Sequence, residues 1–511
     1  MPASFGIVDL FAGPGGLGEG FASLREGGRK PFDIGISVER EASAHRTLTL
    51  RAFLRNYRDR HGLLPRQFVD FHAGRISEPD WETVGKTAWQ HATAEARCLE
   101  LGTQPATDAI DAVIPSLRRN FDDSILIGGP PCQAYSLVGR ARARGKIGYV
   151  PEEDERHYLF REYISVLDRL RPAAFVMENV KGMLSSTVES RRVFEMLVED
   201  LASLGTGGRH LYELKAIRLE DGRASLQDFS KPSDFIVCAE EFGVPQRRHR
   251  VIIVGIRADL ESGISGRSIE VARSPRTVAE AIGNLPRLRS GLSRELDALP
   301  LWRAHAANAA ATLADLFNAN GDKHLAGSFG QLESGFDQVK ALNRSSRSLP
   351  VSYGQSRDEL LNWLECSELE AVAQHETRAH MVSDLGRYLF AAVFGAQRGF
   401  SPKAKDFPEE LSPEHRNWKS GVFNDRFRVQ IAGEPSTTVT SHISKDGHYF
   451  IHPDATQCRS LTVREAARLQ TFPDDYYFLG NRTQQYVQVG NAVPPFLARQ
   501  IARLLVRALG N

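Results

Sequence analysis

One stretch of the chain limits its possible folds more than any other. The apolar run at residues 125–127 leads directly into Gly-Gly-Pro-Pro-Cys-Gln at residues 128–133. An apolar run this short, bounded by turn residues, is typical of a buried strand. The prolines stiffen the backbone ahead of Cys132, and the glycines let another molecule come close. The stretch therefore predicts a strand end that presents a thiol on a rigid loop, although a lone cysteine in such a turn is more often buried and structural.

The first forty residues predict the entry to a nucleotide-binding α/β fold. We expect a buried strand at residues 5–10, a glycine-rich turn opening into a helix at 11–20, and a second strand at 32–38 that is followed by Glu39. An acid in that position can hold the hydroxyl pair of a ribose, although a solvated surface glutamate is an equal alternative. A glycine-rich turn alone could also serve a dinucleotide.

Five motifs, taken together, indicate a family. They are Asp-Leu-Phe-Ala-Gly-Pro-Gly-Gly at 9–16, the Cys132 stretch, Glu-Asn-Val at 178–180, Gln-Arg-Arg-His-Arg at 246–250 and Gly-Asn-Ala-Val-Pro-Pro at 490–495. In this order and spacing the chain resembles the DNA cytosine-5 methyltransferases from near residue 7 to near residue 495. The resemblance implies an α/β fold: a Rossmann-like S-adenosylmethionine-dependent methyltransferase sheet with a second, smaller target-recognition domain.

The resemblance also implies that the cofactor is S-adenosyl-L-methionine. The residues that it assigns to cofactor binding are Phe11, Gly13, Gly15, Glu39, Pro130, Asn491 and Val493. A third strand is expected near residues 68–72, and Arg75 follows it where the family commonly has an aspartate for the adenine amino group. Arginine cannot accept that hydrogen bond. Either Asp70 or a backbone group replaces it, or the adenine is held mainly by stacking.

The catalytic residues implied by the resemblance suit the chemistry of cytosine. C5 is a poor nucleophile, so a thiolate must first add at C6, and Cys132 is suited to that addition. Glu178 would hydrogen-bond N3, and Arg250, with Arg248 nearby, would supply positive charge at O2. The base must leave the duplex stack to reach them. The residues expected to contact the substrate are Gln133, Asn179, Gln246 and Thr438.

Two domains are expected because 511 residues exceed the usual size of one. We expect residues 1–270, completed by 484–511, to form the catalytic and cofactor-binding domain, and residues 271–483 to form the target-recognition domain. Residues 77–122 form a longer connection than the fold needs, and no function is assigned to them. Residues 461–470 predict a helix with a threonine cap and an acid three residues later.

Composition narrows the remaining possibilities only slightly. The net charge of +1 neither favours nor excludes nucleic acid, because a binder needs a basic face rather than a basic total. The five cysteines lack metal-ligand spacing, so we expect reduced thiols and no structural zinc. Without an apolar run of membrane-spanning length or a signal peptide, we expect a monomeric cytoplasmic or nucleoid-associated protein. The partners expected are double-stranded DNA and, functionally, a cognate restriction endonuclease.

Other functions explain fewer of the motifs. A tRNA cytosine-5 methyltransferase of the related kind carries a Cys-Phe-Thr motif, whereas the late cysteines here occur as Glu-Cys-Ser at 365–367 and Gln-Cys-Arg at 457–459. A catalytically silent DNA-binding relative would have no need to keep Cys132, Glu178 and Arg250 together. A nicotinamide oxidoreductase explains the glycine turn alone. Arginines at 139–146 could belong to a loop that closes over DNA, although charged runs are usually solvated surface.

Overall fold

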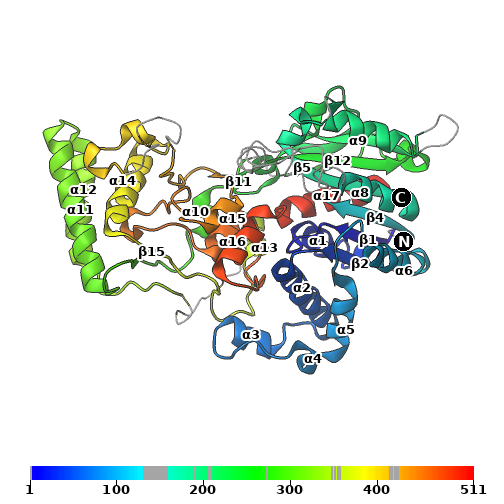
Figure 1. Ribbon diagram of the computed structural model, residues 1–511, viewed down its shortest axis with the longest axis horizontal. Coiled ribbons are helices and arrows are strands. Elements are labelled where there is room, and N and C mark those ends of the chain that lie inside the picture. The colour runs from blue at the N-terminus through cyan, green and yellow to red at the C-terminus, as the bar shows by residue number, and fades with distance from the viewer. Residues whose placement is uncertain are drawn as a thin grey trace, which may run out of the picture. The chain divides into compact units, whose positions relative to one another are not determined.

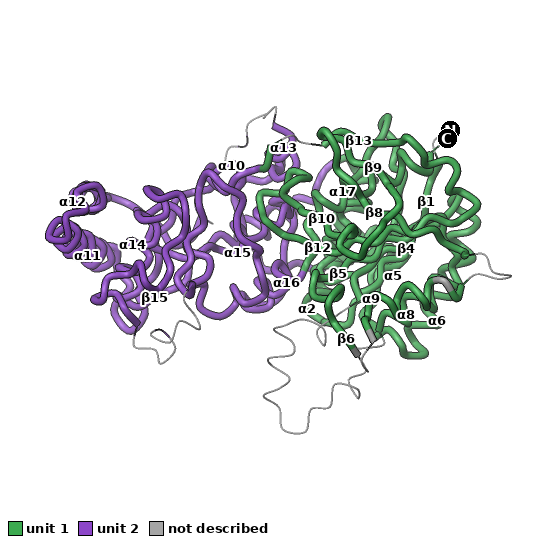
Figure 2. The backbone as a smooth tube through the Cα atoms, turned by 90° about the horizontal axis from the view of Figure 1, so that it is seen from above, with its two compact units in different colours: residues 1–62, 81–275, 492–511 green, residues 63–80, 276–491 purple. Residues whose placement is uncertain are grey.

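The computed structural model describes residues 3–130, 159–188, 191–204, 210–271, 274–346, 349, 353, 358–413, 418 and 425–510. These residues form two compact units (Figure 2). Unit 1 consists of residues 1–62, 81–275 and 492–511, and unit 2 of residues 63–80 and 276–491. Each unit is therefore built from separated stretches of chain. Relative to the boundaries expected from sequence, unit 2 also takes in residues 63–80 and extends to residue 491.

Unit 1 is built on one large mixed sheet with the strand order β13-β9-β8-β12-β5-β4-β1-β2-β3, and β10 pairs with β12 beside this path. Strands β1 to β5 run parallel, and β12 is antiparallel to β5. The strands of the sheet are β1 Phe5–Leu10, β2 Phe32–Glu39, β3 Ala96–Cys98, β4 Asp123–Gly128, β5 Ala174–Val180, β8 Tyr212–Glu220, β9 Arg223–Gln227, β10 Ile236–Cys238, β12 His249–Arg257 and β13 Ser268–Glu270. Three short strands lie outside it: β6 Thr187–Val188, β7 Arg191–Arg192 and β11 Gln246–Arg247. The α/β class expected from sequence is confirmed.

Helices cover both faces of this sheet (Figure 1). The helices are α1 Gly16–Ala22, α2 Ala42–His61, α4 Trp81–Val84, α5 Lys86–Glu95, α6 Gln104–Asn120, α8 Leu159–Leu170, α9 Val193–Ala202 and α17 Pro495–Leu509, with 3-10 turns η3 Lys181–Ser185, η4 Pro232–Phe235, η5 Ala239–Phe242 and η6 Ala258–Gly263. Helices α6, α8 and α9 share a core with one face of the sheet, and α1 and α17 share a core with the other.

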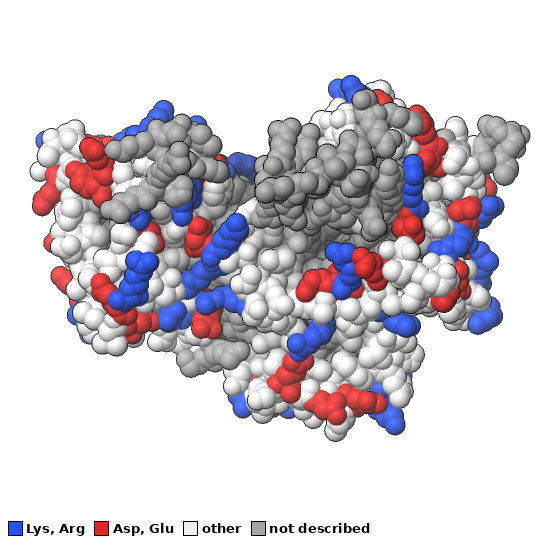
Figure 3. Space-filling view, viewed as in Figure 1, with Lys and Arg blue, Asp and Glu red and all other residues white. Residues whose placement is uncertain are grey.

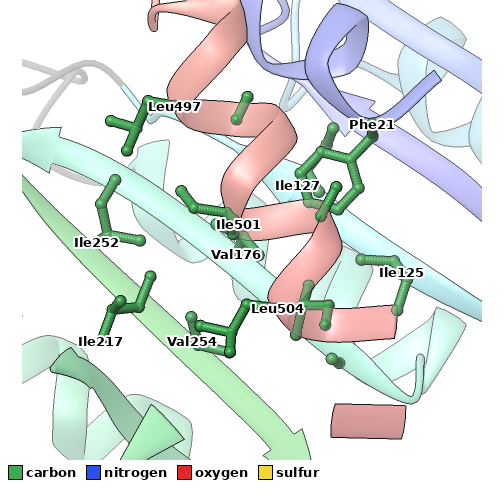
Figure 4. Close-up of a cluster of buried hydrophobic side chains, with 14 of the residues drawn as sticks. Phe21, Ile125, Ile127, Val176, Ile217, Ile252, Val254, Leu497, Ile501 and Leu504 are labelled. Atoms are coloured by element: carbon green, nitrogen blue, oxygen red, sulfur yellow. The ribbon is translucent and has the colours of Figure 1, made fainter. Parts of the chain in front are cut away.

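Strand residues alternate between the two cores, as the period of two in a strand requires. Ile125 and Ile127 of β4 belong to the core under α17, whereas Leu126 between them belongs to the opposite core. Figure 4 shows Leu497, Ile501 and Leu504 of α17 directed at the side chains of β4, β5 and β12. The last helix of the chain thus seals a sheet face formed by strands that begin near residue 5.

The third strand lies elsewhere than expected. Residues 68–72, predicted as a strand, belong to the helix α3 Arg66–His72, and this helix is part of unit 2. The strand beside β2 is β3, paired Ser37 to Ala96 and Glu39 to Cys98. The prediction was wrong because an apolar run of four or five residues fits either element. The stretch at 77–122 therefore has a structural task, since it supplies β3 and the helix α6, which packs against β2 and β4.

Unit 2 is mainly helical. Its helices are α3, α10 Val278–Ile282, α11 Leu299–Ala319, α12 Lys323–Asp337, α13 Glu359–Leu364, α14 Val382–Arg398, α15 Val463–Leu469 and α16 Arg482–Asn491, with 3-10 turns η7 Ala404–Asp406, η8 Glu409–Leu411, η9 Ser441–Ser444 and η10 Ala455–Gln457 and short strands β14 Gly291–Leu292, β15 Ala379–His380 and β16 Ser436–Thr437. Helices α11, α12 and α14 share an aromatic core. Trp418 and Phe427, which stand among basic residues in the sequence, are buried in this core.

The predicted helix at 461–470 is confirmed as α15, and its capping box is formed by Thr462 and Glu465. Glu465 also receives two hydrogen bonds of 2.6 Å from Arg459, and both side chains are 1% exposed. Although burial opposes it, the Arg459 guanidinium holds the pKa of Glu465 below its ordinary value. Paired and fully bonded charges of this kind fix the conformation of the segment that carries them.

Charge is mixed across the surface. The chain carries 64 Lys and Arg against 63 Asp and Glu, and both signs are interspersed on the face in Figure 3. Among the described residues, no helix combines the length and apolar character that crossing a bilayer requires.

Candidate active site

The glycine turn after β1 is held open by a carboxylate at the end of β2. Glu39 Oε2 accepts a hydrogen bond of 2.8 Å from the backbone N–H of Gly13, and its Oε1 accepts one of 2.6 Å from the N–H of Glu41. Gly13 and Gly15 have φ of 58° and 100°, and a β-carbon on Gly13 would meet nothing within 4 Å. The turn therefore leaves open space beside the Gly13 backbone, which a ligand can approach closely.

Phe11, in the same turn, has φ of 55°. A bulky residue rarely adopts this left-handed conformation, which costs about 1–3 kcal/mol and recurs at ligand sites. Its position at the carboxyl end of β1 places this strained residue on the edge of the sheet where open α/β folds bind their ligands.

Asp9 of β1 is a buried acid that the sequence analysis did not single out. It is 1% exposed, and neither carboxylate oxygen has a hydrogen-bond partner among the described residues. Burial, and then the charges of Glu95 and Glu39, raise the pKa of Asp9 well above its ordinary value. A cationic group bound beside Asp9 would offset the cost of burying its negative charge. The sequence signal that could have found it is an acid in an otherwise apolar strand, at the first position of the motif at 9–16.

The proline loop after β4 is anchored from β5. Asn179 Nδ2 donates a hydrogen bond of 3.0 Å to the carbonyl of Pro130, and both residues are buried. A β-carbon on Gly129 would lie 2.9 Å from Glu178 Oε2, and one on Gly128 would lie 2.5 Å from the carbonyl of Leu10. Glycine is therefore required at residue 128, where the obstacle is backbone, whereas a side chain at residue 129 would displace the Glu178 carboxylate. Asn179, predicted to contact substrate, also has a positioning task that its motif did not reveal.

Glu178 and Arg250 form an ion pair at the same edge. Arg250 Nε lies 2.9 Å from Glu178 Oε1, and the side chains are 13% and 14% exposed. In the antiparallel pairing of β5 and β12, Arg250 is opposite Val180 and Ile252 is opposite Glu178, so the two charged side chains are diagonal neighbours on one face. Arg250 Nη1 also donates to the carbonyl of His249 at 2.9 Å. The guanidinium is thus held from two sides.

Arg248, expected near Arg250, is 1% exposed. Burial, and then the charge of Arg250, lower the pKa of Arg248 well below its ordinary value, while the Glu178 carboxylate acts in the opposite direction. Arg248 and Arg250 thus lie close to the Glu178 carboxylate where strands β5 and β12 meet. A guanidinium held at this edge suits an anion or a polarised carbonyl oxygen.

The structure brings together some of the predicted residues and leaves others aside. Phe11, Gly13, Gly15 and Glu39 form one group, and Pro130, Glu178, Asn179, Arg248 and Arg250 form a second at adjacent strand ends, since Leu10 pairs with Gly128 and Gly128 with Met177. Gln246 is buried in β11, and Val493 belongs to the core of unit 1. Thr438 and Asn491 lie in unit 2. Cys132, Gln133 and the basic run at 139–146 lie outside the described residues.

The adenine question takes a different form in the structure. Arg75 and Asp70 both lie in unit 2, where Arg75 pairs with Asp70 at 2.8 Å and with Glu370. They do not follow the third strand of the sheet, so Arg75 does not stand in the place where the family commonly has the aspartate. The residues after β3 are Leu99, whose N–H donates 3.1 Å to the carbonyl of Glu39, and Glu100.

Comparison with known proteins places these groups in a family. The sequence model described as C-5 cytosine-specific DNA methylase matches residues 105–507. The chain is 32% identical to the type II methyltransferase M.Bpa9945I of Bacillus paralicheniformis over 97% of each chain. It is 25% identical to M.AgeI of Thalassovita gelatinovora over 98% of this chain and 99% of that one. It is 26% identical to the DNA (cytosine-5-)-methyltransferase M.ApeKI of Aeropyrum pernix, over 76% and 82%.

The family match spans most of the chain, including the strands that carry Glu178 and Arg250. The Glu178–Arg250 pair and the anchored Pro130 loop lie within the matched residues 105–507. The chain is a member of the C-5 cytosine-specific DNA methylase family and is a DNA (cytosine-5-)-methyltransferase.

Proposed function

We propose that this enzyme methylates one short double-stranded DNA sequence through a covalent bond between Cys132 and the target cytosine, as the modification partner of a type II restriction system. The observation that carries the proposal is the Glu178–Arg250 pair beside the anchored Pro130 loop, which leads directly to Cys132. The relatives named type II methyltransferases support the biological setting.

S-adenosyl-L-methionine, which the family uses, fits the residues present. The open backbone at Gly13, with Phe11, Gly15 and Glu39, would hold it, and the two unpartnered oxygens of Asp9 favour a ligand that brings positive charge. S-adenosylmethionine carries both a sulfonium and an ammonium group. When bound, it supplies the electrophilic methyl group that C5 acquires. Pro130, Asn491 and Val493 are proposed as further contacts.

The chain's own residues activate the base. The Cys132 thiolate adds to C6, and the electron pair displaced from the C5–C6 bond moves toward C5, N3 and O2. Glu178 hydrogen-bonds N3, and Arg250 stabilises the charge at O2 from a position that their ion pair fixes before the base arrives. After methylation a base removes the C5 proton, the C5–C6 double bond re-forms, and the thiolate leaves.

Access to these groups requires the cytosine to leave the duplex. Extruding one base costs a few kcal/mol, and contacts to the surrounding DNA must offset that cost. We assign these contacts to unit 2 as the target-recognition domain, with Thr438, and to Gln133 and Gln246. Arg248, two residues before Arg250, is proposed as a second catalytic arginine.

The adenine of the cofactor is proposed to meet the residues after β3. Glu100 follows that strand and pairs at 2.6 Å with Arg40, the residue directly after Glu39. Glu100→Ala should weaken S-adenosylmethionine binding about tenfold, the loss of a hydrogen bond to a charged group. Arg75→Ala is the matched control, since Arg75 lies in unit 2. Calorimetry showing the opposite order would reject the placement.

Bisulfite sequencing of host DNA after expression tests the proposed function. We expect 5-methylcytosine in one short motif, lost in Cys132→Ala and retained in Cys366→Ala. An oligonucleotide carrying that motif with a 5-fluorinated cytosine should form a covalent adduct at Cys132. Unmodified DNA, modification confined to tRNA, or an adduct at another residue would reject the proposal.

Glu39→Ala tests the cofactor group separately. Because Glu39 supports the glycine turn, its loss should weaken cofactor binding much more than DNA binding. Equal losses in calorimetry would contradict the assignment.

A further inference from the structure

A thiol, a carboxylate and an imidazole converge in unit 1 where strand β10 pairs with strand β12. They are Cys238 at the end of β10, Glu240 in η5 and His249 at the start of β12, and one ligand atom from each lies within 4.8 Å of the others. Glu240 Oε1 lies 2.7 Å from His249 Nε2. The three residues lie within twelve positions of the sequence and include a single cysteine, so the cysteine spacing that predicted no zinc could not reveal them.

The backbone fixes this convergence. Strands β10 and β12 are antiparallel, and Cys238 is directly opposite His249. Directly opposed residues have β-carbons about 4.5–5.5 Å apart on the same face of the sheet. Glu240 follows Cys238 by two residues, and the turn η5 brings its carboxylate back to the imidazole. The arrangement therefore exists before any ligand binds.

The second carboxylate oxygen of Glu240 is available to a ligand. Glu240 Oε2 is buried and has no hydrogen-bond partner among the described residues. A cation bound among the three side chains would give this oxygen a partner.

We propose that Cys238, Glu240 and His249 bind a divalent zinc-type cation. Sulfur, nitrogen and oxygen donors together suit zinc, whereas magnesium and calcium prefer oxygen alone. Tetrahedral zinc with bonds of about 2.0–2.3 Å holds its ligand atoms about 3.3–3.8 Å apart. The Glu240–His249 hydrogen bond of 2.7 Å would therefore open on binding, and ligand atoms now up to 4.8 Å apart would move closer. The His249 side chain is 34% exposed, which leaves room for water as a fourth ligand.

The bound cation would link strand β10 to strand β12. His249 is the residue whose carbonyl accepts the hydrogen bond from Arg250 Nη1, so fixing His249 also fixes the backbone that positions Arg250. This is a positioning role, and it is independent of whether Cys132 forms a bond to cytosine.

Cobalt(II) titration of the metal-free, untagged full chain tests the site. We expect one equivalent to bind with a thiolate-to-cobalt charge-transfer band, displaced by one equivalent of zinc. Cys238→Ser should abolish the band, whereas Cys366→Ser, another half-buried cysteine, and Cys132→Ala should retain it. Glu240→Gln and His249→Gln should weaken binding by more than the about 10- to 100-fold that is typical of lost outer-shell partners.

Stability gives a second readout. Zinc should raise the melting temperature of the wild-type chain and of Cys366→Ser, and should leave that of Glu240→Gln unchanged, because only a protein that binds metal gains stability by mass action. Absence of stoichiometric cobalt binding, or a band that persists in Cys238→Ser, would overturn the proposal. Should Cys238→Ser fail to fold, an undiminished affinity in both Glu240→Gln and His249→Gln would overturn it equally.

Discussion

Replacing Glu178 by glutamine tests whether its ion pair with Arg250 serves catalysis or stability. The glutamine side chain has almost the same size, and its carbonyl oxygen can still accept a hydrogen bond from Arg250 Nε, now 2.9 Å from the carboxylate. What the substitution removes is the negative charge and the capacity to carry a proton to N3 of the base. The two roles of Glu178 therefore separate in two different measurements.

The stability cost follows from the partial burial of the pair. Exposed ion pairs contribute about 0–1 kcal/mol, and breaking a fully buried pair costs about 3–5 kcal/mol. With side chains 13% and 14% exposed and one hydrogen bond retained, we expect the free energy of unfolding to fall by about 2 kcal/mol. Since domains of this kind have about 5–15 kcal/mol in reserve, more than about 99% of the variant stays folded.

Activity should fall much further. Loss of one preorganised group at a developing charge typically costs about 100- to 1000-fold in kcat, or about 2.7–4 kcal/mol of transition-state stabilisation. We expect a decrease of that size in single-turnover methylation of an oligonucleotide that carries the target, with urea unfolding measured on the same preparation. The DNA-binding affinity should change far less than kcat.

A matched control lies at the other end of β12. There Arg257 Nε pairs with Asp259 Oδ1 at 2.8 Å, remote from the strand ends that carry the site. Asp259→Asn should leave kcat unchanged. A Glu178→Gln variant that loses activity only in proportion to its unfolded fraction, or no more than Asp259→Asn does, would refute the catalytic role.

Two further predictions concern residues at the same sheet edge. Because the pKa of Asp9 is raised in the folded chain, stability is lost as pH rises from the ordinary aspartate value of about 3.9 toward the raised value. Asp9→Asn should therefore stabilise the chain against urea more at about pH 8 than at about pH 4, and it should weaken cofactor binding. An equal gain in stability at both pH values would contradict a raised pKa for Asp9. Gly129→Ala places a methyl group 2.9 Å from Glu178 Oε2 and should lower kcat about tenfold or more by displacing that carboxylate. The control Gly327→Ala, in open space on α12, should leave kcat unchanged. Unchanged turnover in Gly129→Ala would show that the position of the Glu178 carboxylate is not critical.

The elements that could be predicted from sequence are those whose local pattern suffices. The buried strands at 5–10 and 125–127 are apolar runs between turn residues. The capping box of α15 can be recognised from Thr462 and Glu465, which are three residues apart. The third strand could not be found in this way. Strand β3 has three residues, of which Arg97 and Cys98 are exposed at a sheet edge, and so it carries no periodic signal.

Long-range pairing explains the remaining differences. Nothing near Asn179 indicates that its amide holds the carbonyl of Pro130, 49 residues earlier. Likewise, Cys238 and His249 meet only because two strands run antiparallel. The motifs located the strand ends correctly, but the contacts between those ends depend on the register of the sheet.

The position of α17 in the sequence affects how the protein can be made. Residues 492–511 belong to unit 1 and follow all of unit 2 in synthesis. Until they leave the ribosome, the apolar residues of β4, β5 and β12 that α17 covers remain open to water and to other nascent chains. The enzyme therefore depends on protection of an unfinished sheet while more than two hundred residues are translated, and slow translation or scarce chaperones should limit its yield before any defect in catalysis does.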